Sequence, residues 1–178
     1  MSAAEGTLVL YGEGAGDVAR RMLPKLPGSC FDQVGPDALG AAVGRAVADG
    51  TAQVVLVAGL DEQTAFLSGP AGFDGVLGSI TLDMDGGAAL VAEVATAETS
   101  RRAYELWESA GVLGPCGREL CRRTAGELER LAAAAAGTET SPVAAQVVLL
   151  DAEGERMVGM FGRMGRPGGR SSTDERAR

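Results

Sequence analysis

The sequence of 178 residues contains no histidine. Histidine is the side chain whose ordinary pKa lies nearest neutrality, and it is the commonest general base and metal ligand. Its absence excludes a Ser–His or Cys–His nucleophile, a histidine-ligated zinc site and an imidazole proton shuttle. Catalysis would have to rest on carboxylates, cysteines, tyrosines, arginines or the single lysine, Lys25. The sequence therefore favours a non-catalytic protein, and it predicts neither a bound cofactor nor a metal site.

Cysteines, aromatic residues and long apolar runs are also scarce. Cys30, Cys116 and Cys121 are too few for a disulfide framework, and reduced thiols are typical of the cytoplasm. No apolar run approaches the roughly 18 residues of a membrane span, and the first residues do not resemble a signal peptide. The net charge of −8 argues against contact with a nucleic-acid backbone. These features predict a cytoplasmic protein that binds neither membrane nor nucleic acid.

Apolar residues make up 46% of the chain, and aromatics only 4%, so a core would be built from Ala, Val and Leu. This length is typical of one domain. We place that domain at residues 1–162. The remainder, 163–178, is rich in Gly, Arg and Ser and is predicted to be a disordered tail.

Short apolar runs alternate with helical patterns in the first third of the chain. Strands are predicted at 7–11, 28–33 and 53–59, with helices at 17–26 and 36–49. Two hairpins are predicted later, at 79–94 around Gly86–Gly87 and at 146–161, with helices between them at 98–110 and 118–136. This order, β-α-β-α-β followed by a hairpin, two helices and a hairpin, predicts a three-layer α/β fold with a mixed five-stranded sheet.

A glycine-rich segment, Gly12–Asp17, follows the first strand and precedes a helix. That is the context of a dinucleotide-binding loop. The third glycine of that fingerprint is replaced here by Asp17, and a carboxylate at that position would repel a pyrophosphate. We interpret the segment as a plain strand-to-helix turn.

Two further groups of residues have a structural and a functional interpretation. Cys116 and Cys121 would lie roughly 140° apart around a helix, so they cannot share one metal ion. Cys116 could be a reactive thiol near a helix N-terminus, but a small core residue is the favoured interpretation. Several arginines near the later helices are best explained as a solvated face paired with glutamates, although they could contact an anionic phosphopantetheine carrier. They are Arg101, Arg102, Arg118, Arg122 and Arg123.

The segment 33–94 resembles the β-ketoacyl synthases of the thiolase superfamily. In that family a nucleophilic cysteine at a strand-to-helix elbow is followed by a small-residue helix and an apolar strand. Residues 34–49 look like that helix, and 50–59 (GTAQVVLVAG) look like that strand. Residues 85–93 (DGGAALVAE) are similar to a later strand of the family. Gly40 and Gly44 would allow close packing of the helix. The resemblance implies a half-length protein with a half-thiolase-like fold.

At the elbow, the family spacing places Gln33 where the nucleophilic cysteine stands. That replacement resembles the chain-length factors of aromatic polyketide synthases. It implies a non-catalytic subunit of polyketide or fatty-acyl biosynthesis that pairs with a condensing enzyme or with itself, and contacts an acyl carrier protein. Cys30, Phe31 and Gln33 are the predicted pocket residues, and Cys30 could be the nucleophile if the elbow were shorter than usual.

Two other readings of the residues stay open. The chain could be a small doubly wound α/β module that binds a ligand or assembles with partners, unrelated to acyl chemistry. It could also be a thiol enzyme that uses Cys30 or Cys116 without histidine. Alkylation of the thiols and co-purification with a condensing enzyme would separate these hypotheses.

Overall fold

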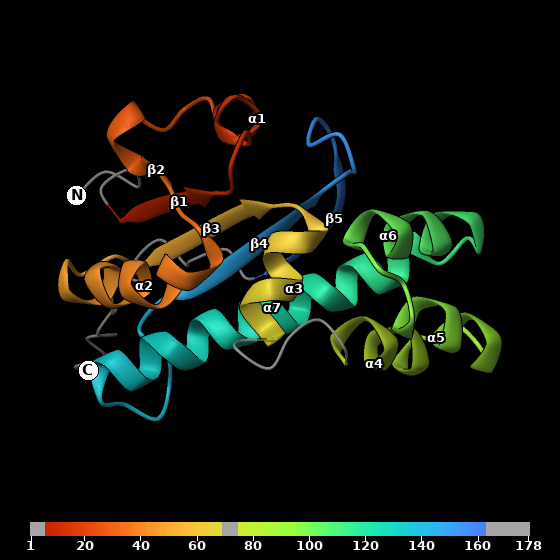
Figure 1. Ribbon diagram of the computed structural model, residues 1–178. Coiled ribbons are helices and arrows are strands. Elements are labelled where there is room, and N and C mark those ends of the chain that lie inside the picture. Colours follow the sequence, from red (N-terminus) through yellow and green to blue (C-terminus); the bar gives the residue numbers. More distant parts are fainter. Residues whose placement is uncertain (1–5, 69–74, 163–178) are drawn as a thin grey trace, which may run out of the picture.

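The computed structural model describes residues 6–68 and 75–162, and shows an α/β protein with a mixed five-stranded sheet (Figure 1). The strand order is β2-β1-β3-β4-β5. The first four strands run parallel, and β5 runs antiparallel to β4. The strands are β1 Thr7–Tyr11, β2 Phe31–Gln33, β3 Gln53–Ala58, β4 Ala144–Leu150 and β5 Met157–Gly162. The predicted α/β class and mixed sheet are confirmed, whereas the predicted tail at 163–178 lies outside the described residues.

Seven α-helices and two short 3₁₀ turns, Gly28–Cys30 and Pro36–Ala38, connect the described strands. The helices are α1 Gly16–Met22, α2 Leu39–Ala48, α3 Leu60–Ser68, α4 Val76–Asp83, α5 Ala88–Ala95, α6 Ser100–Ser109 and α7 Leu113–Ala136. Among the residues that the structure describes, no helix combines the length and apolar character needed to cross a membrane.

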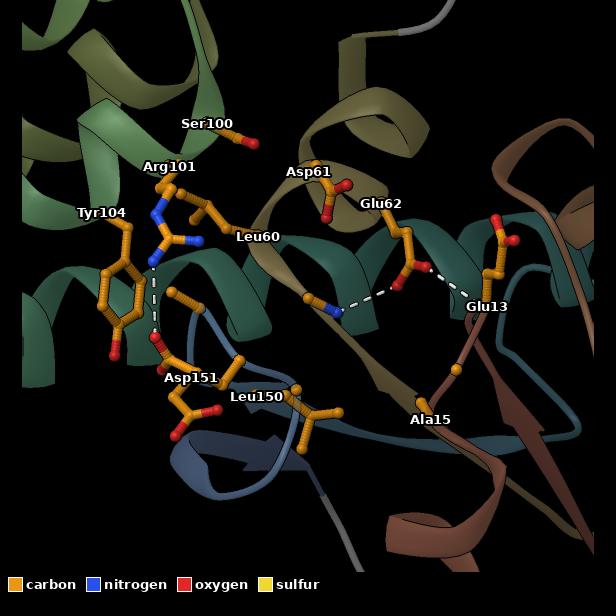
Figure 2. Close-up of a pocket in the computed structure, with 15 residues that line it drawn as sticks. Glu13, Ala15, Leu60, Asp61, Glu62, Ser100, Arg101, Tyr104, Leu150 and Asp151 are labelled. Carbon is orange, nitrogen blue, oxygen red and sulfur yellow. Dashed lines mark hydrogen bonds and ion pairs between the residues drawn. The ribbon is translucent and has the colours of Figure 1, made fainter.

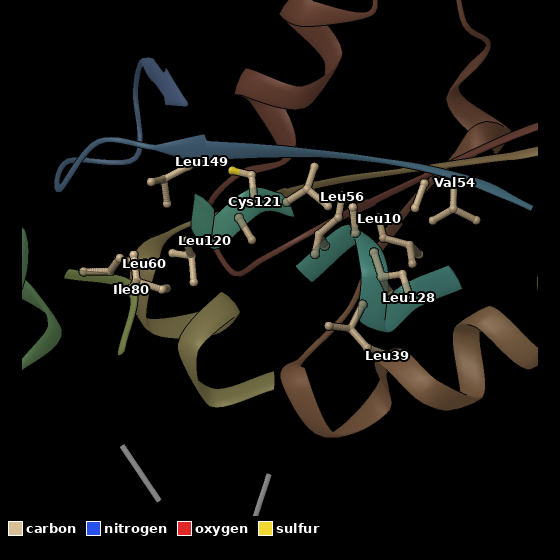
Figure 3. Close-up of a cluster of buried hydrophobic side chains, with 14 of the residues drawn as sticks. Leu10, Leu39, Val54, Leu56, Leu60, Ile80, Leu120, Cys121, Leu128 and Leu149 are labelled. Atoms are coloured by element: carbon tan, nitrogen blue, oxygen red, sulfur yellow. The ribbon is translucent and has the colours of Figure 1, made fainter. Parts of the chain in front are cut away.

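Both faces of the sheet are buried, which explains the continuous apolar run of β3. Leu56 belongs to the larger core cluster, on the side covered by α2, α3 and α7 (Figures 1 and 3). Val55 and Val57 point to the opposite side, where they pack with residues of α1. A parallel strand that lies between two layers of helices carries apolar residues on both sides. The central strands of the sheet therefore pack against helices on both faces, which is compatible with a three-layer fold.

Helices α4, α5 and α6 form a separate group beside α3 and α7 (Figure 1). The hairpin predicted at 79–94 is wrong, because α4 and α5 occupy this segment. The turn between them needs positive φ at Asp85 (57°) and Gly87 (88°). Gly87 adopts that conformation without steric cost, and aspartate is among the residues that tolerate it, in a helix–helix turn as in a hairpin. The flanking residues include good helix formers, Ala, Leu and Glu, which are compatible with the helices observed.

The long helix α7 is joined to α4 by Arg123, which also pairs with a buried carboxylate of α7. Glu119 is 8% exposed, and it accepts hydrogen bonds from Arg122 (2.6 and 2.7 Å) and Arg123 (3.0 Å). Arg123 also pairs with Asp83 of α4 and donates to Ser79. Hydrogen bonds from Arg122 and Arg123 hold the pKa of Glu119 below its usual value, although burial acts in the opposite direction. The Glu119 carboxylate is therefore ionised where it pairs with Arg123, and Arg123 in turn joins α7 to α4.

The two glycines of α2 do not make the close packing contact predicted for them. Nothing lies within 4 Å of a Cβ built on Gly40 or Gly44. Gly126 of α7 has the same open surroundings, whereas a Cβ on Gly117 of that helix would lie 3.0 Å from Leu149 Cδ2. Of these four helical glycines, Gly117 is the one that packs closely against a neighbouring side chain.

Gly44→Ala and Gly126→Ala are each expected to raise the free energy of unfolding by about 0.5–1 kcal/mol, because alanine restricts the unfolded chain and favours the helix. Chemical denaturation monitored by circular dichroism measures the change. Gly117→Ala is the matched control in α7, and it should be neutral or destabilising because Leu149 must move. A destabilised Gly126→Ala variant would contradict the open surroundings seen here.

Candidate functional site

A cleft lies beyond the carboxyl ends of the parallel strands (Figure 2). The loops after β1, β3 and β4 form three of its walls, and the start of α6 forms the fourth. Its volume is about 350 Å³, which suits a small molecule. The lining residues are Glu13, Gly14, Ala15, Gly59, Leu60, Asp61, Glu62, Ser100, Arg101, Tyr104, Leu150, Asp151, Ala152, Glu153 and Gly154.

The strand order explains why a cleft forms at this place. From β1 the chain continues into α1 on one face of the sheet, and from β3 it continues into α3 on the other face. The loops that leave β1 and β3 therefore diverge to opposite faces. In open α/β sheets, ligands bind in the crevice that this divergence leaves at the carboxyl ends of the strands.

The glycine-rich loop after β1 is shaped by its glycines. The Gly12 N–H donates to Val57 O (3.0 Å), and the Ala15 N–H donates to Gly12 O (3.0 Å). Gly14 has φ of 77°, and no atom lies within 4 Å of a Cβ built on it. The space beside Gly14, at the cleft, is thus left open to a ligand. Asp17 is not among the residues that line the cleft.

Glu62 connects the loops that follow β1 and β3 (Figure 2). Its carboxylate accepts hydrogen bonds from the Gly59 N–H (3.0 Å) and the Glu13 N–H (3.1 Å). A Cβ on Gly12 would overlap this carboxylate, so a larger residue there would displace the Glu62 side chain from its position. Burial raises the pKa of Glu62, the hydrogen bond from Gly59 lowers it, and the net direction is upward.

The rest of the cleft is mostly acidic. Asp61, Asp151 and Glu153 line it together with Glu13 and Glu62, and Arg101 is the basic side chain among the lining residues. Arg101 lies 3.5 Å from Glu153, and both side chains are more than half exposed. An acidic cleft with low-dielectric walls attracts cationic ligands and disfavours anionic ones. Within the described residues, no group of carboxylates and thiols converges in a way that could hold a metal ion.

Tyr104 of α6 forms the wall opposite the glycine-rich loop (Figure 2). It is 6% exposed. Burial raises the pKa of its hydroxyl, and the nearby carboxylates of Glu108, Asp151 and Glu153 act in the same direction. The hydroxyl is therefore neutral at physiological pH and can donate a hydrogen bond.

The three residues predicted to share a pocket lie in different places. Gln33 is exposed at the end of β2 and lines a second, shallower cavity beside Glu13 and Glu62. Cys30 is buried at the other end of the same strand and lines a cavity near the start of β1. Phe31 packs against the α1 face of the core, where the Arg20 guanidinium lies 5.5 Å from its ring centroid.

The structure distinguishes between the competing interpretations of the two helix cysteines and of the arginines near the later helices. Cys116 and Cys121 are fully buried core residues, and burial raises the pKa of Cys116 to about 11 and that of Cys121 to about 12. Thiols with such pKa values are not nucleophiles near neutrality. Four of the five arginines form ion pairs with glutamates, as the solvated-face interpretation predicted: Arg101 and Arg102 pair with Glu105, and Arg122 and Arg123 pair with Glu119.

The chain is similar to proteins named cobalt-precorrin-5B C(1)-methyltransferase. The relative from Salinispora tropica is 39% identical over 175 residues, which cover 92% of this chain and 44% of the relative. The relative from Rubrobacter xylanophilus is 36% identical over 144 residues, which cover 75% of this chain and 37% of the relative. The chain thus spans less than half the length of these relatives. No protein-family model matches it, and neither does any solved structure.

These similarities overturn the resemblance to a ketosynthase. The relatives are methyltransferases by name, so the assignments as a β-ketoacyl synthase-like protein, a chain-length factor and a polyketide or fatty-acid subunit are wrong. The structure shows one reason, because residues 88–95 form helix α5 where the resemblance implied a strand. Apolar strands after small-residue helices are common in α/β proteins. The condensing-enzyme and carrier partners depended on this resemblance and are not proposed further.

Proposed function

We propose that this chain binds the methyl donor of a C-methyltransferase and takes part in the methylation of a cobalt-precorrin. The observation that carries the proposal is the 39% identity to the Salinispora tropica cobalt-precorrin-5B C(1)-methyltransferase across 92% of the chain. The cleft beyond the carboxyl ends of β1, β3 and β4 supports it, because this position suits a nucleoside-containing ligand.

The chemistry of the cleft fits S-adenosylmethionine, the sulfonium nucleoside that most methyltransferases use. When bound, this donor supplies an electrophilic methyl group. Its sulfonium is positively charged and it carries no phosphate, so the acidic cleft favours it. The argument that Asp17 repels a pyrophosphate does not apply to such a ligand. The open space beside Gly14 lets the ligand approach the backbone closely, and the carboxylates of Asp61 and Asp151 can accept hydrogen bonds from hydroxyl groups.

A methyl transfer of this kind does not require histidine. The methyl group moves to the acceptor carbon directly, and the protein contributes mainly by holding the two reactants in line and excluding water. The volume of about 350 Å³ suits one small molecule. We therefore place the donor inside the cleft and the cobalt-precorrin at its mouth.

Isothermal titration calorimetry of the chain with S-adenosylmethionine and S-adenosylhomocysteine tests the proposal. Both are expected to bind. Gly14→Gln should weaken binding by about tenfold or more, because its side chain extends into the open space beside the cleft, and tenfold corresponds to about 1.4 kcal/mol.

Gly50→Gln is the matched control for that variant. Gly50 has φ of 73° and equally open surroundings, but it follows α2 and does not line the cleft. Both variants introduce similar backbone strain, so a loss of binding confined to Gly14→Gln locates the ligand. If the unmodified chain binds neither compound, or if both variants lose binding equally, the donor does not occupy this cleft.

A further inference from the structure

Glu62 occupies the two backbone donors that would otherwise serve an anionic ligand. We propose that Glu62 is a specificity-determining residue that excludes phosphate-bearing ligands from the cleft by occupying these donors with its own carboxylate. The inference rests on the proposed function, because it takes the cleft as the ligand site. It restricts the class of expected ligands to nucleosides without phosphate.

The two donors stand where phosphate groups are bound in related architectures. Crevices at the carboxyl ends of parallel strands hold phosphates through N–H groups of the loop after the first strand and of helix N-termini. Here the Glu13 N–H belongs to the loop after β1, and the Gly59 N–H immediately precedes α3. Each donates to a different oxygen of Glu62, at 3.1 Å and 3.0 Å.

The backbone around the Glu62 carboxylate provides both its hydrogen-bond donors and the space that it fills. Glu62 lies in the first turn of α3 and reaches across to the loop after β1, a contact between residues far apart in the sequence (Figure 2). The absence of a Cβ at Gly12 leaves the room that the carboxylate fills. Because both N–H groups are satisfied internally, the cleft offers fewer donors to an incoming anion.

The negative charges around Glu62 disfavour a phosphate, as the occupied N–H donors do. A phosphate placed at this position would meet Glu62 and, at the same rim, Glu13 and Asp61. Two like charges a few ångströms apart repel strongly at the effective dielectric constant of a protein surface. S-adenosylmethionine carries a sulfonium and an ammonium against a single carboxylate, so its net charge is positive and the same carboxylates attract it. The arrangement therefore discriminates between two classes of nucleoside.

The test measures binding of inorganic pyrophosphate to the whole chain by calorimetry. The unmodified chain should bind it weakly or not at all. Glu62→Ala frees both N–H groups, leaves space over Gly12, and is expected to bind pyrophosphate at least about tenfold more tightly. Asp61→Ala is the matched control, since it removes the same charge from the same rim while Glu62 keeps both donors. The increase in pyrophosphate affinity should be much smaller for Asp61→Ala than for Glu62→Ala.

Equal gains in the two alanine variants, or no gain in Glu62→Ala, would overturn the inference. If Glu62→Ala does not fold by circular dichroism, Glu62→Gln replaces it and is compared with Asp61→Asn. The amide of Glu62→Gln has one acceptor oxygen, so it should free one donor and exceed the Asp61→Asn variant in pyrophosphate affinity. The pyrophosphate result is independent of donor binding. A chain that fails to bind S-adenosylmethionine contradicts the proposed function, whereas the Glu62 comparison decides this inference.

Discussion

Trp107→Ala is expected to lower the free energy of unfolding by about 3–5 kcal/mol, the largest loss among the substitutions considered. Trp107 is the single tryptophan and is fully buried in α6. Its indole N–H donates to Thr81 Oγ1 (2.9 Å), which in turn donates to Leu77 O (2.7 Å). The residue therefore joins α6 to α4 by both packing and a hydrogen bond. Urea denaturation followed by circular dichroism measures the loss.

Trp107→Phe separates the two contributions. It keeps an aromatic ring in the core but removes the N–H donor, so we expect a smaller loss of about 1–2 kcal/mol. In the unmodified protein, the buried indole also provides a fluorescence probe of unfolding. A loss below about 1 kcal/mol for the alanine variant would show that the α4–α6 group contributes little to stability.

Gln63→Leu is expected to cost about 2–4 kcal/mol, because three hydrogen bonds are lost in a place that water does not reach. Gln63 is 1% exposed. Its amide nitrogen donates to Ala58 O (3.3 Å) and Val148 O (3.2 Å), and its amide oxygen accepts from Thr124 Oγ1 (3.1 Å). One side chain thus ties α3 to β3, β4 and α7 directly beneath Glu62. Thermal and chemical denaturation give the size of the loss.

Thr124→Val isolates one bond of this network. The single hydroxyl hydrogen of Thr124 is shared between Gln63 Oε1 (3.1 Å) and Leu120 O (2.9 Å), so the valine variant should lose about 1 kcal/mol. The variant that combines Gln63→Leu and Thr124→Val completes a double-mutant cycle. A coupling energy of about 0.5 kcal/mol or more between the two positions is expected, because the two side chains are in contact. Strictly additive losses would mean that the Gln63–Thr124 bond contributes nothing.

The parallel part of the sheet could be predicted from the sequence. Buried strands such as β3 carry apolar residues on both faces, and helices of period 3.6 separate them, so pattern and structure agree. The same holds for the final hairpin, where β4 and β5 flank the turn at Ala152–Glu155. The local sequence pattern suffices to predict strands that pair with the preceding or following strand in the sequence.

Residues 76–95 show where pattern reasoning fails. Apolar runs on both sides of Gly86–Gly87 fit a hairpin, yet they form α4 and α5, which pack on each other rather than on the sheet. Leu77, Ile80 and Thr81 of α4 are buried, a spacing typical of a helix. A short apolar run is ambiguous between helix and strand, and the packing partner decides. The partner could not be read from this segment alone.

The cleft can be recognised in part from the sequence. Gly12–Asp17 has the context of a nucleotide-binding loop, but Asp17 would repel a phosphate. That objection holds for one class of ligand and not for a sulfonium nucleoside. Glu62 cannot be recognised from the sequence, because its contact with the loop after β1 depends on the tertiary fold and nothing in its sequence neighbourhood marks it. The lack of histidine excludes general-base chemistry by imidazole, but it carries no weight against direct group transfer.

The position of β4 in the sheet has a consequence for biosynthesis. β3 pairs with β1 on one side and with β4 on the other, but residues 59–143 separate β3 from β4 in the chain. During translation, the β3 edge that awaits β4 is uncovered until almost the entire domain has left the ribosome. Such an open, apolar edge is a template for wrong pairing between nascent chains. We therefore expect the yield of native protein in cells to depend on chaperones and on the speed of elongation through this long connection.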